Sequence, residues 1–340
     1  MAGARGGGVL SRWKDVPVLV TGAQGFVGSW LAERLLGEGA RVVTLLRDVE
    51  PGARFTTDGI GDRCTHVRAD LVDYEALVRT LNEHGVRAVF HLAAQTIVMT
   101  ANRSPLSTFE TNIRGTYTLL EACRAVGVVG DPVERIIVAS SDKAYGRHDQ
   151  LPYQEHFPLQ AMYPYDVSKA ATDMIARSYA ATYDMPVAVT RLANVYGGGD
   201  PNMSRIIPDS ARLIADDKQP VIRSDGSPQR DYLYVEDAVD AYLTIAESLD
   251  DRGLWGRAWN AGTGTPVSVK EVVARLIAVS KKDIEPDIQG DGTPLGEIDR
   301  QFLDSSAIKA ELGWEPRWDL DRGLAATYEW YAAAGSRQGR

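Results

Sequence analysis

Two short segments of the sequence carry residues that could remove a proton from an alcohol. Tyr165 and Lys169 are four positions apart, so a helix would place them on one face. An ammonium beside a phenol lowers the phenol pKa from about 10 toward neutral pH. Ser141 follows an apolar run at residues 135–139, where a hydroxyl at the end of a strand could hold the oxygen that Tyr165 deprotonates. The two segments together predict a proton-abstracting site, although a Tyr/Lys pair alone is more often a solvated helix face.

A glycine-rich loop lies near the start of the chain. Residues 18–20 form an apolar run, Gly22, Gly25 and Gly28 follow it, and a helical pattern covers residues 29–37. In this strand–loop–helix context, glycines allow a tight turn and let backbone N–H groups approach a pyrophosphate at the helix N-terminus. The loop therefore predicts a dinucleotide site, with a simple glycine-rich turn as the alternative.

Residues after the second and third predicted strands would contact the adenosine end of such a dinucleotide. Asp48 could accept a hydrogen bond from the ribose 2′-hydroxyl, which favours NAD, whereas Arg47 could meet the 2′-phosphate of NADP. The sequence slightly favours NAD, and either residue could also be a solvated loop charge. Asp70 and Leu71 suit a contact with the adenine edge, but Asp70 could equally be the N-cap of the next helix.

The elements that must position these residues alternate along the first half of the chain. Apolar runs predict strands at residues 18–20, 41–45, 66–68, 88–91, 135–139 and 186–190. Amphipathic patterns between them predict helices at residues 30–37, 74–83 and 105–125. Alternation with continuously apolar strands predicts an α/β fold, a doubly wound parallel sheet of the Rossmann type covered on both faces.

We divide the chain into two units. Residues 13–195 form the nucleotide-binding domain, and residues 228–250 contain a strand and a helix that return to it. Residues 196–227 and 251–335, where turn clusters separate shorter elements, form a smaller C-terminal α/β lobe for the substrate.

Composition excludes several classes of protein. The 340 residues carry 37 Lys and Arg against 46 Asp and Glu, a net charge of −9, so nucleic acid is not the main partner. No apolar stretch approaches the roughly 18 residues that a membrane span needs. Cys64 and Cys123 cannot form a disulfide framework, and no Cys/His cluster has the spacing of a metal site. Two reduced thiols indicate a cytoplasmic protein.

Taken together, these motifs resemble the extended short-chain dehydrogenases/reductases of the nucleotide-sugar epimerase/dehydratase family. The resemblance extends from Val18 to about Trp314 and includes, besides the motifs above, Asn112 and residues 91–95, 191–199, 230–232 and 312–314. It implies a doubly wound NAD(P)-binding domain, a C-terminal lobe for a nucleoside-diphosphate sugar, and an active site between them.

The resemblance also implies roles residue by residue. Ser141 would bind the C4 oxygen of the sugar, Tyr165 would be the base, and Lys169 would hold the nicotinamide ribose. Contacts to the cofactor would come from Gly22, Gln24, Gly25, Phe26, Val27, Gly28, Ala93 and Ala94. Contacts to the substrate would come from Gln95, Asn194, Arg205, Arg230 and Arg300. Among these, Asn194 could instead be a turn former, and Arg230 and Arg300 could be surface charges.

Asp142 and Lys143, directly after Ser141, bear on the fate of the sugar once C4 is oxidised. A 4,6-dehydratase needs a base for the C5 proton and an acid for the departing C6 hydroxyl. The pair most resembles that of CDP-glucose 4,6-dehydratases, with Asp142 as the acid and Lys143 as the base. It could also be an ion pair that only orders the loop. The sequence favours a 4,6-dehydratase over a 4-epimerase, with a catalytically silent cofactor-binding sensor as a remote third hypothesis.

The helices expected at residues 105–125 and 165–182 each carry more apolar surface than one core face needs. In the resembled family, the equivalent helices pair between subunits. The resemblance therefore implies a homodimer, although an apolar stripe is more often part of a core.

Overall fold

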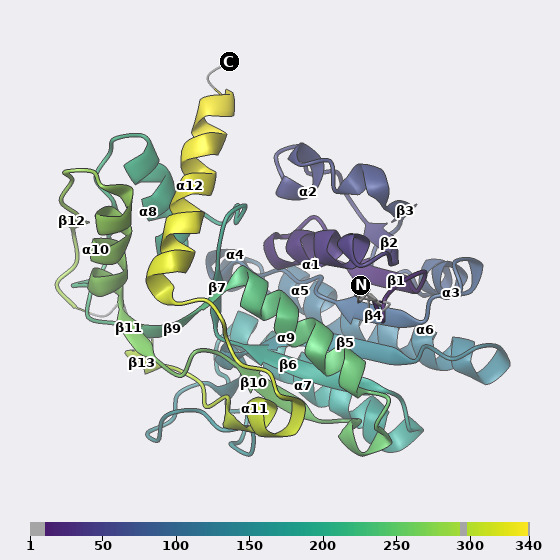
Figure 1. Ribbon diagram of the computed structural model, residues 1–340. Coiled ribbons are helices and arrows are strands. Elements are labelled where there is room, and N and C mark those ends of the chain that lie inside the picture. Colours follow the sequence, from purple (N-terminus) through teal and green to yellow (C-terminus); the bar gives the residue numbers. More distant parts are fainter. Residues whose placement is uncertain (1–10, 293–297, 339–340) are drawn as a thin grey trace, which may run out of the picture.

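The chain is built around a parallel sheet of seven strands. The structure, a computed structural model, describes residues 11–292 and 298–338. The strand order is β3–β2–β1–β4–β5–β6–β10, and every pair is parallel (Figure 1). The strands are β1 (Pro17–Thr21), β2 (Arg41–Leu46), β3 (Thr65–Arg68), β4 (Ala88–His91), β5 (Arg135–Ser141), β6 (Val187–Leu192) and β10 (Ala258–Ala261). All six strands predicted from the sequence are present, which confirms the doubly wound α/β fold.

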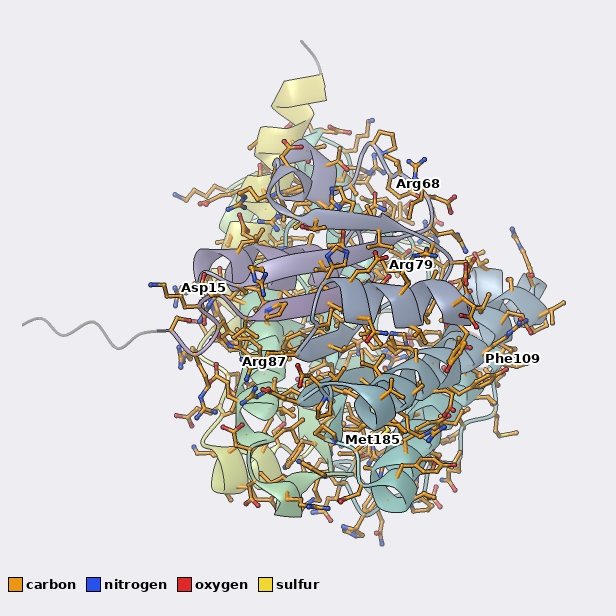
Figure 2. The ribbon with its side chains drawn as sticks, turned by 90° about the vertical axis from the view of Figure 1, so that its right-hand side faces the viewer. Asp15, Arg68, Arg79, Arg87, Phe109 and Met185 are labelled. Carbon is orange, nitrogen blue, oxygen red and sulfur yellow. The ribbon has the colours of Figure 1, made fainter. Side chains whose placement is uncertain are left out.

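Apolar side chains on the two faces of this sheet enter separate cores. Val18 and Val20 contribute to a core that contains residues of α1 (Phe26–Gly37) and α9 (Val235–Ser248). Leu19, between them, enters a second core, shared with α3 (Tyr74–Glu83), α6 (Gly115–Val129) and α7 (Pro164–Tyr183). Because neighbouring residues of a strand point to opposite faces, continuously apolar strands need helices on both sides. In Figure 2, Arg79 marks α3 and Phe109 marks the helical segment before α6.

The winding of the sheet reverses at β1, which lies between β2 and β4. In open parallel sheets, ligands bind beyond the carboxyl ends of the strands at such a switch point. The glycine loop follows β1, residues 92–95 follow β4, and Ser141 is the last residue of β5. All three predicted motifs therefore meet at one edge of the sheet.

A smaller lobe is centred on β9 (Gln229–Tyr234). This strand pairs with β7 (Asn194–Tyr196), β11 (Pro266–Ser268) and β13 (Arg300–Gln301), while β8 (Val221–Ile222) pairs with β12 (Asp287–Ile288). Three helices pack against one another beside these strands (Figure 1): α8 (Ile206–Ala215), α10 (Val269–Ser280) and α12 (Leu320–Gln338).

Strand β10 departs from the predicted division of the chain. It lies within residues 251–335, which the sequence assigns to the smaller lobe, yet it pairs with β6 in the main sheet, and α11 (Ser306–Leu312) packs against it. Residues 258–261 contain no β-branched side chain, so the pattern that predicts the other strands is missing here. Helix α9 packs against β5, β6 and α1, whereas β9 stays in the smaller sheet. The other domain boundaries stay a prediction.

Short helical elements complete the fold. They are α2 (Arg54–Thr57), η1 (Gly61–Arg63), α4 (Val98–Arg103), α5 (Pro105–Phe109), the π-helical turn η2 (Glu110–Arg114), η3 (Asp142–Tyr145) and η4 (Arg252–Leu254). The helix predicted at residues 105–125 is therefore interrupted by a π turn between α5 and α6. Within the described ranges, no helix is long and apolar enough to cross a membrane.

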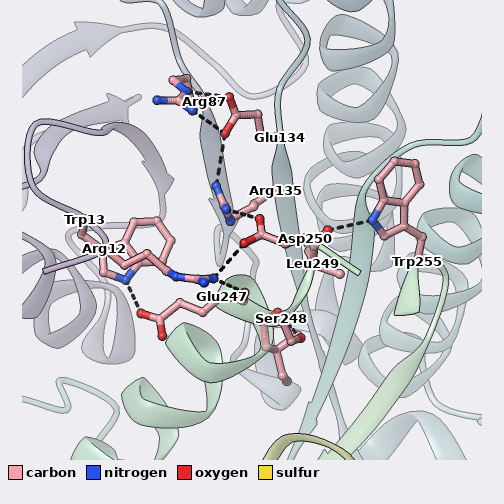
Figure 3. Close-up of polar contacts among 11 residues, drawn as sticks. Arg12, Trp13, Arg87, Glu134, Arg135, Glu247, Ser248, Leu249, Asp250 and Trp255 are labelled. Carbon is pink, nitrogen blue, oxygen red and sulfur yellow. Dashed lines mark hydrogen bonds and ion pairs between the residues drawn. The ribbon is translucent and has the colours of Figure 1, made fainter. Parts of the chain in front are cut away.

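Charged groups tie the amino ends of the central strands to the end of α9 (Figure 3). Arg87, just before β4, donates to both carboxylate oxygens of Glu134 at 2.6 and 2.8 Å. Arg135, at the start of β5, binds Asp250, which also accepts from Arg12 at 2.9 Å. This network lies at the end of the sheet opposite the predicted motifs, so we regard it as structural.

One ion pair lies fully inside the protein, between α7 and β6. Arg191 donates to the two carboxylate oxygens of Asp173 at 2.7 and 3.0 Å, and the two side chains are 1% and 0% exposed. The same guanidinium donates to the hydroxyl of Tyr145 at 2.7 Å. The pair fixes α7 against the sheet.

Removing one partner of this pair should destabilise the protein strongly. We expect Asp173→Asn to lower the free energy of unfolding by about 3 to 5 kcal/mol, because the Arg191 guanidinium stays buried without a counter-charge. Denaturant unfolding measures the change. Glu110→Gln, which breaks the exposed pair with Arg114, is the control and should leave the unfolding midpoint nearly unchanged. Equal losses in the two variants would contradict the expectation.

Candidate active site

The glycine loop is packed so tightly that it leaves no room for side chains. Gly22 has a φ of +74°, and a Cβ there would lie 2.7 Å from the backbone nitrogen of Ala93. A Cβ on Gly28 would lie 2.1 Å from the carbonyl oxygen of Gly22. The start of α1 and the loop after β4, which holds Ala93 and Ala94, therefore both lie against the turn after β1.

The N-terminus of α1 fits a pyrophosphate group. Its N-cap residue is Gly25, no side chain of the described residues caps it, and its first turn carries no acidic residue. The N–H groups of the first turn, on Phe26, Val27 and Gly28, are the ones that a helix leaves without intrahelical partners. Together with the helix dipole they attract an anion, so the loop predicted from the sequence has the shape and polarity that a dinucleotide needs.

The side chain of Gln24 holds the loop that follows β2. Its amide donates to the carbonyl oxygen of Asp48 at 2.6 Å and accepts from the backbone of Glu50 at 2.9 Å. Arg47 and Asp48 bind each other at 2.6 Å, both exposed, and this hydrogen bond raises the pKa of Arg47. The ion pair keeps the two residues predicted to contact the adenosine ribose together at the end of β2.

Asp70 forms a turn and does not cap the next helix. Its carboxylate accepts from the backbone of Val72 at 3.1 Å, whereas the N-cap of α3 is Asp73. The interpretation of Asp70 as the N-cap is therefore wrong. Leu71 is buried, and a Cβ on Gly115 of α6 would lie 2.4 Å from its side chain. The contact of Asp70 and Leu71 with adenine stays a prediction.

Ser141, Tyr165 and Lys169 meet where α7 crosses the end of β5. The Ser141 side chain is among the groups that lower the pKa of Tyr165, and the Ser141 hydroxyl donates to Asp142 at 2.9 Å. The ammonium of Lys169 donates to the carbonyl oxygen of Ala139 at 2.8 Å. The helix spacing predicted from the sequence thus places the phenol and the ammonium over the strand that carries Ser141.

Burial dominates the acid–base properties of these groups. Desolvation lowers the pKa of Lys169 from 10.5 to about 8 and raises the pKa of Tyr165 from 10.0 to about 12. The cation that most lowers the Tyr165 pKa is the guanidinium of Arg205, a role that the sequence predicts for Lys169. The Arg205 guanidinium donates to the carbonyl oxygen of Val195 at 3.0 Å and to the carboxylate of Asp200 at 2.9 Å, and its predicted contact with the substrate stays a prediction.

Asp142 is a buried acid, and only one of its two carboxylate oxygens accepts a hydrogen bond from a described residue. Its side chain is 2% exposed, and desolvation raises its pKa against the opposing charges of Lys143 and Arg230. Oδ1 accepts from Ser141, while Oδ2 is buried and has no hydrogen-bond partner among the described residues. A carboxyl group in such surroundings keeps its proton to a higher pH than usual, which suits a general acid.

A buried amide in the π turn joins the loop after β4 to α7. The side chain of Asn112 accepts from the Gln95 backbone at 2.7 Å, donates to the Gln95 carbonyl at 3.0 Å, and donates to Ser168 at 2.8 Å. The Gln95 side chain accepts from the backbone of Ile97 at 2.5 Å and so closes its own loop. Its predicted contact with substrate stays a prediction.

The other residues predicted to bind substrate lie at different places around this centre. The Arg230 guanidinium is nearly buried, and its charge acts on Asp142. Asn194, on β7, has a buried Nδ2 donor with no hydrogen-bond partner in the described part of the chain, so it could serve a ligand oxygen. Arg300 is exposed, with its guanidinium 4.9 Å from the ring centroid of Phe302. Their roles stay predictions.

One acidic residue of the centre escapes the sequence analysis. Asp166 follows Tyr165 on α7 and is 7% exposed. Desolvation raises its pKa to about 6, while the charge of Lys143 lowers it. Acidic residues are common in the first turn of a helix, so the residue type alone does not single out Asp166.

His91, at the end of β4, is another buried titratable group. Its ring nitrogens bond Thr21 at 2.8 Å and Thr116 at 3.0 Å. Desolvation, together with the charge of Lys169, lowers the pKa of His91 to about 3, so the ring is neutral at physiological pH. No cluster of three His, Cys, Asp or Glu residues that could hold a metal occurs in residues 11–292 and 298–338.

Comparison with known proteins identifies the family to which the chain belongs. The model of the family described as GDP-mannose 4,6 dehydratase matches residues 19–327. The chain belongs to this family. The match confirms the resemblance to the extended short-chain dehydrogenases/reductases that modify nucleotide sugars.

The known proteins that this chain resembles include both dehydratases and epimerases. The CDP-glucose 4,6-dehydratase of Salmonella typhimurium is 30% identical over 335 residues, which cover 94% of this chain and 92% of the relative. The UDP-glucose 4-epimerase of Mycolicibacterium smegmatis is 32% identical over 318 residues, which cover 92% of this chain and 97% of the relative. The crystal structure of the dTDP-glucose 4,6-dehydratase of Streptomyces venezuelae, with NAD and TYD bound, is 28% identical, covers 95% of this chain and 98% of that chain, and superimposes with a TM-score of 0.84.

A methyl group in the glycine loop should weaken cofactor binding. We expect Gly28→Ala to raise the Kd for NAD by at least about tenfold, because the new Cβ would overlap the Gly22 carbonyl and displace α1 from the turn. Isothermal titration calorimetry measures the Kd. Gly37→Ala is the control on the same helix, since a Cβ there meets nothing within 4 Å. Equal NAD affinity in both variants would contradict the role of the loop.

Proposed function

We propose that the protein is an NAD-dependent nucleoside-diphosphate-hexose 4,6-dehydratase, which forms a 4-keto-6-deoxy sugar. The observation that carries this proposal is the buried Asp142 beside Lys143, directly after the hydroxyl of Ser141 and next to Tyr165. The dehydratases among its relatives, one of them solved with NAD, support the assignment.

The first half of the reaction would use the groups at the end of β5. Ser141 would hold the C4 oxygen of the sugar, and Tyr165 would take the C4 hydroxyl proton as the carbonyl forms. NAD, when bound, accepts a hydride from C4 and later returns it. Lys169, which already donates to the Ala139 carbonyl, would hold the nicotinamide ribose.

The second half would use Asp142 and Lys143. The C4 carbonyl acidifies the C5 proton, so Lys143, as a neutral amine, would take that proton while Asp142 protonates the C6 oxygen. The C6–O bond breaks, water leaves, and a C5–C6 double bond forms. Hydride return to C6 and proton return to C5 then complete the product. Protons and electrons balance over these steps, so the reaction needs no external oxidant.

A 4-epimerase is the second candidate. The UDP-glucose 4-epimerase relative matches this chain over nearly its whole length. An epimerase needs Ser141, Tyr165 and Lys169 but no acid and base for C5 and C6. On that hypothesis, Asp142 and Lys143 would only order η3. The intact set of Ser141, Tyr165 and Lys169 speaks against a catalytically silent sensor.

The product of the reaction separates these hypotheses. We expect incubation with NAD and a panel of nucleoside-diphosphate hexoses to give one product that has lost one water and carries solvent deuterium at C5. Mass spectrometry of the sugar nucleotides measures both changes. A product of unchanged mass with an inverted C4 would establish the epimerase, and unchanged sugar with every nucleotide would exclude both enzymes.

Replacing the proposed acid should stop the reaction after oxidation at C4. We expect Asp142→Asn to slow water loss by about 100-fold or more, because an amide cannot protonate the C6 oxygen. The near-ultraviolet absorbance of reduced nicotinamide should still rise, since Ser141 and Tyr165 are unchanged. Tyr165→Phe is the matched comparison and should prevent that rise. Normal water loss by Asp142→Asn would refute the proposed acid.

We also propose that the protein is a homodimer that works in the cytoplasm. Large apolar side chains are exposed on the helices of one side: Leu106, Tyr117, Met174 and Tyr183. Both cysteines are free, and burial raises the pKa of Cys64 to about 11, which suits inert thiols in a reducing compartment.

Sedimentation velocity tests the dimer. We expect Met174→Glu combined with Leu106→Glu to convert the protein to a monomer, because the charges would be buried in the apolar interface. Ile288→Glu, on the exposed edge of the smaller lobe, is the control and should not change the sedimentation coefficient. A wild-type protein that sediments as a monomer would refute the proposal.

A further inference from the structure

Tyr145 ends the short helix η3, whose first two residues are Asp142 and Lys143. Its side chain is 0% exposed, and no step of the proposed reaction uses it. In a 3₁₀ helix, side chains three positions apart lie on the same side of the axis, so Asp142 and Tyr145 share one side of η3. The phenol is therefore placed to act on the proposed acid through a single helical turn.

The hydroxyl of Tyr145 is held by two adjacent strands of the main sheet. Arg191 of β6 donates to it at 2.7 Å, and the hydroxyl donates to Oδ1 of Asn260 on β10 at 2.7 Å. Arg191 and Asn260 are direct partners across these two strands, so their side chains point to the same face of the sheet. The anchor of η3 thus includes β10, the strand that the sequence does not predict.

The donors and acceptors around this hydroxyl allow only one arrangement. A guanidinium can only donate, and the amide nitrogen of Asn260 already donates to the carbonyl oxygens of Tyr153 at 2.9 Å and Asp304 at 3.2 Å. The amide oxygen therefore faces the phenol and takes its single proton. The side chains of Tyr145, Arg191 and Asn260 are all fully buried, so water cannot replace either hydrogen bond.

The phenol is not needed as a partner for the buried charge. Arg191 is already matched by both carboxylate oxygens of Asp173 on α7, and that ion pair does not involve the hydroxyl. The ring of Tyr145 stacks on that of Tyr153, with centroids 4.9 Å apart. Removing the hydroxyl alone therefore keeps the ion pair and the aromatic packing and loosens only η3.

In the proposed reaction, Asp142 loses its other support. Its Oδ1 accepts one hydrogen bond, from the Ser141 hydroxyl at 2.9 Å, and its Oδ2 has no partner among the described residues. A hydroxyl has one proton, so Ser141 cannot donate to Asp142 and to the C4 oxygen of the sugar at the same time. Once Ser141 donates to the sugar, the carboxyl group of Asp142 depends on η3 for its position.

We propose that Tyr145 is a positioning residue for water loss. Its hydroxyl, fixed between β6 and β10, holds η3 so that Asp142 stays at the C6 oxygen and Lys143 at the C5 proton. The phenol keeps its own proton and touches no reacting atom. Oxidation at C4 uses groups that β5 and α7 hold, so it does not depend on the phenol. This inference rests on the proposed 4,6-dehydration, and its tests separate the two.

The balance of the two half-reactions in Tyr145→Phe tests the inference. With NAD and the sugar nucleotide that loses water, the variant should form reduced nicotinamide at the wild-type rate. It should lose water at least about tenfold more slowly, because a misplaced acid and base act poorly. Reduced nicotinamide should therefore accumulate, and its near-ultraviolet absorbance in stopped flow measures both rates.

Tyr196→Phe is the control for this measurement. It also removes a buried phenol hydroxyl, one that donates to the Leu320 carbonyl at 3.3 Å in the smaller lobe, and it should leave the balance unchanged. Equal slowing of both half-reactions in Tyr145→Phe would show a purely structural role and overturn the inference. Water loss at the wild-type rate would overturn it as well.

Hydrogen exchange tests the anchor without turnover. The backbone N–H of Lys143 donates to the Ser141 hydroxyl oxygen at 3.2 Å, and that of Gly146 donates to the Lys143 carbonyl at 3.2 Å. In Tyr145→Phe, these amides should exchange at least about tenfold faster than in the wild type, while those of α7 stay unchanged, as read by peptide mass spectrometry. Unchanged exchange in η3 would overturn the inference. If no sugar nucleotide loses water, the proposed function fails, while the exchange still decides whether the phenol holds η3.

Discussion

The burial of one face of α7 is the constraint on which the active site depends. The ion pair between Asp173 and Arg191 fixes this helix on the sheet, because separating the pair would leave a buried charge uncompensated. With the helix in place, Lys169 reaches the carbonyl of Ala139 and Tyr165 meets the hydroxyl at the end of β5. The same burial desolvates these groups and shifts their pKa values. Position and reactivity therefore have one physical cause.

The glycine loop, which follows β1, imposes a second constraint on the site. Gly28 and Gly22 are in contact only because neither has a side chain, and this contact aims the first turn of α1 at the carboxyl edge of the sheet. On the proposed function, an anion held there and a ribose held by Lys169 would fix the two ends of one extended ligand. The fold would then set the position of the reacting ring from two anchors that are far apart in the sequence.

Those parts of the molecule that depend on local sequence could be predicted, and those that depend on packing could not. Residues with β-branched side chains occur in each of β1 to β6, but β10 contains none, and its place beside β6 arises from tertiary contacts. Spacing on one helix reveals Tyr165 and Lys169. The raised pKa of Asp166 arises from burial against neighbouring elements. The effect of the Arg205 charge on the Tyr165 pKa arises because a residue of the smaller lobe lies near α7.

The net charge of −9 gives these arginines a second role. A nucleoside diphosphate must find local positive charge to enter a protein that repels it overall, and on the proposed function Arg205 and Arg230 of the smaller lobe would supply that charge. The same two cations favour the phenolate of Tyr165 and the carboxylate of Asp142. A bound diphosphate would neutralise them, so Asp142 would hold its proton more firmly when substrate is present. Binding of the nucleoside diphosphate would thereby keep Asp142 protonated, as its proposed role as the acid requires.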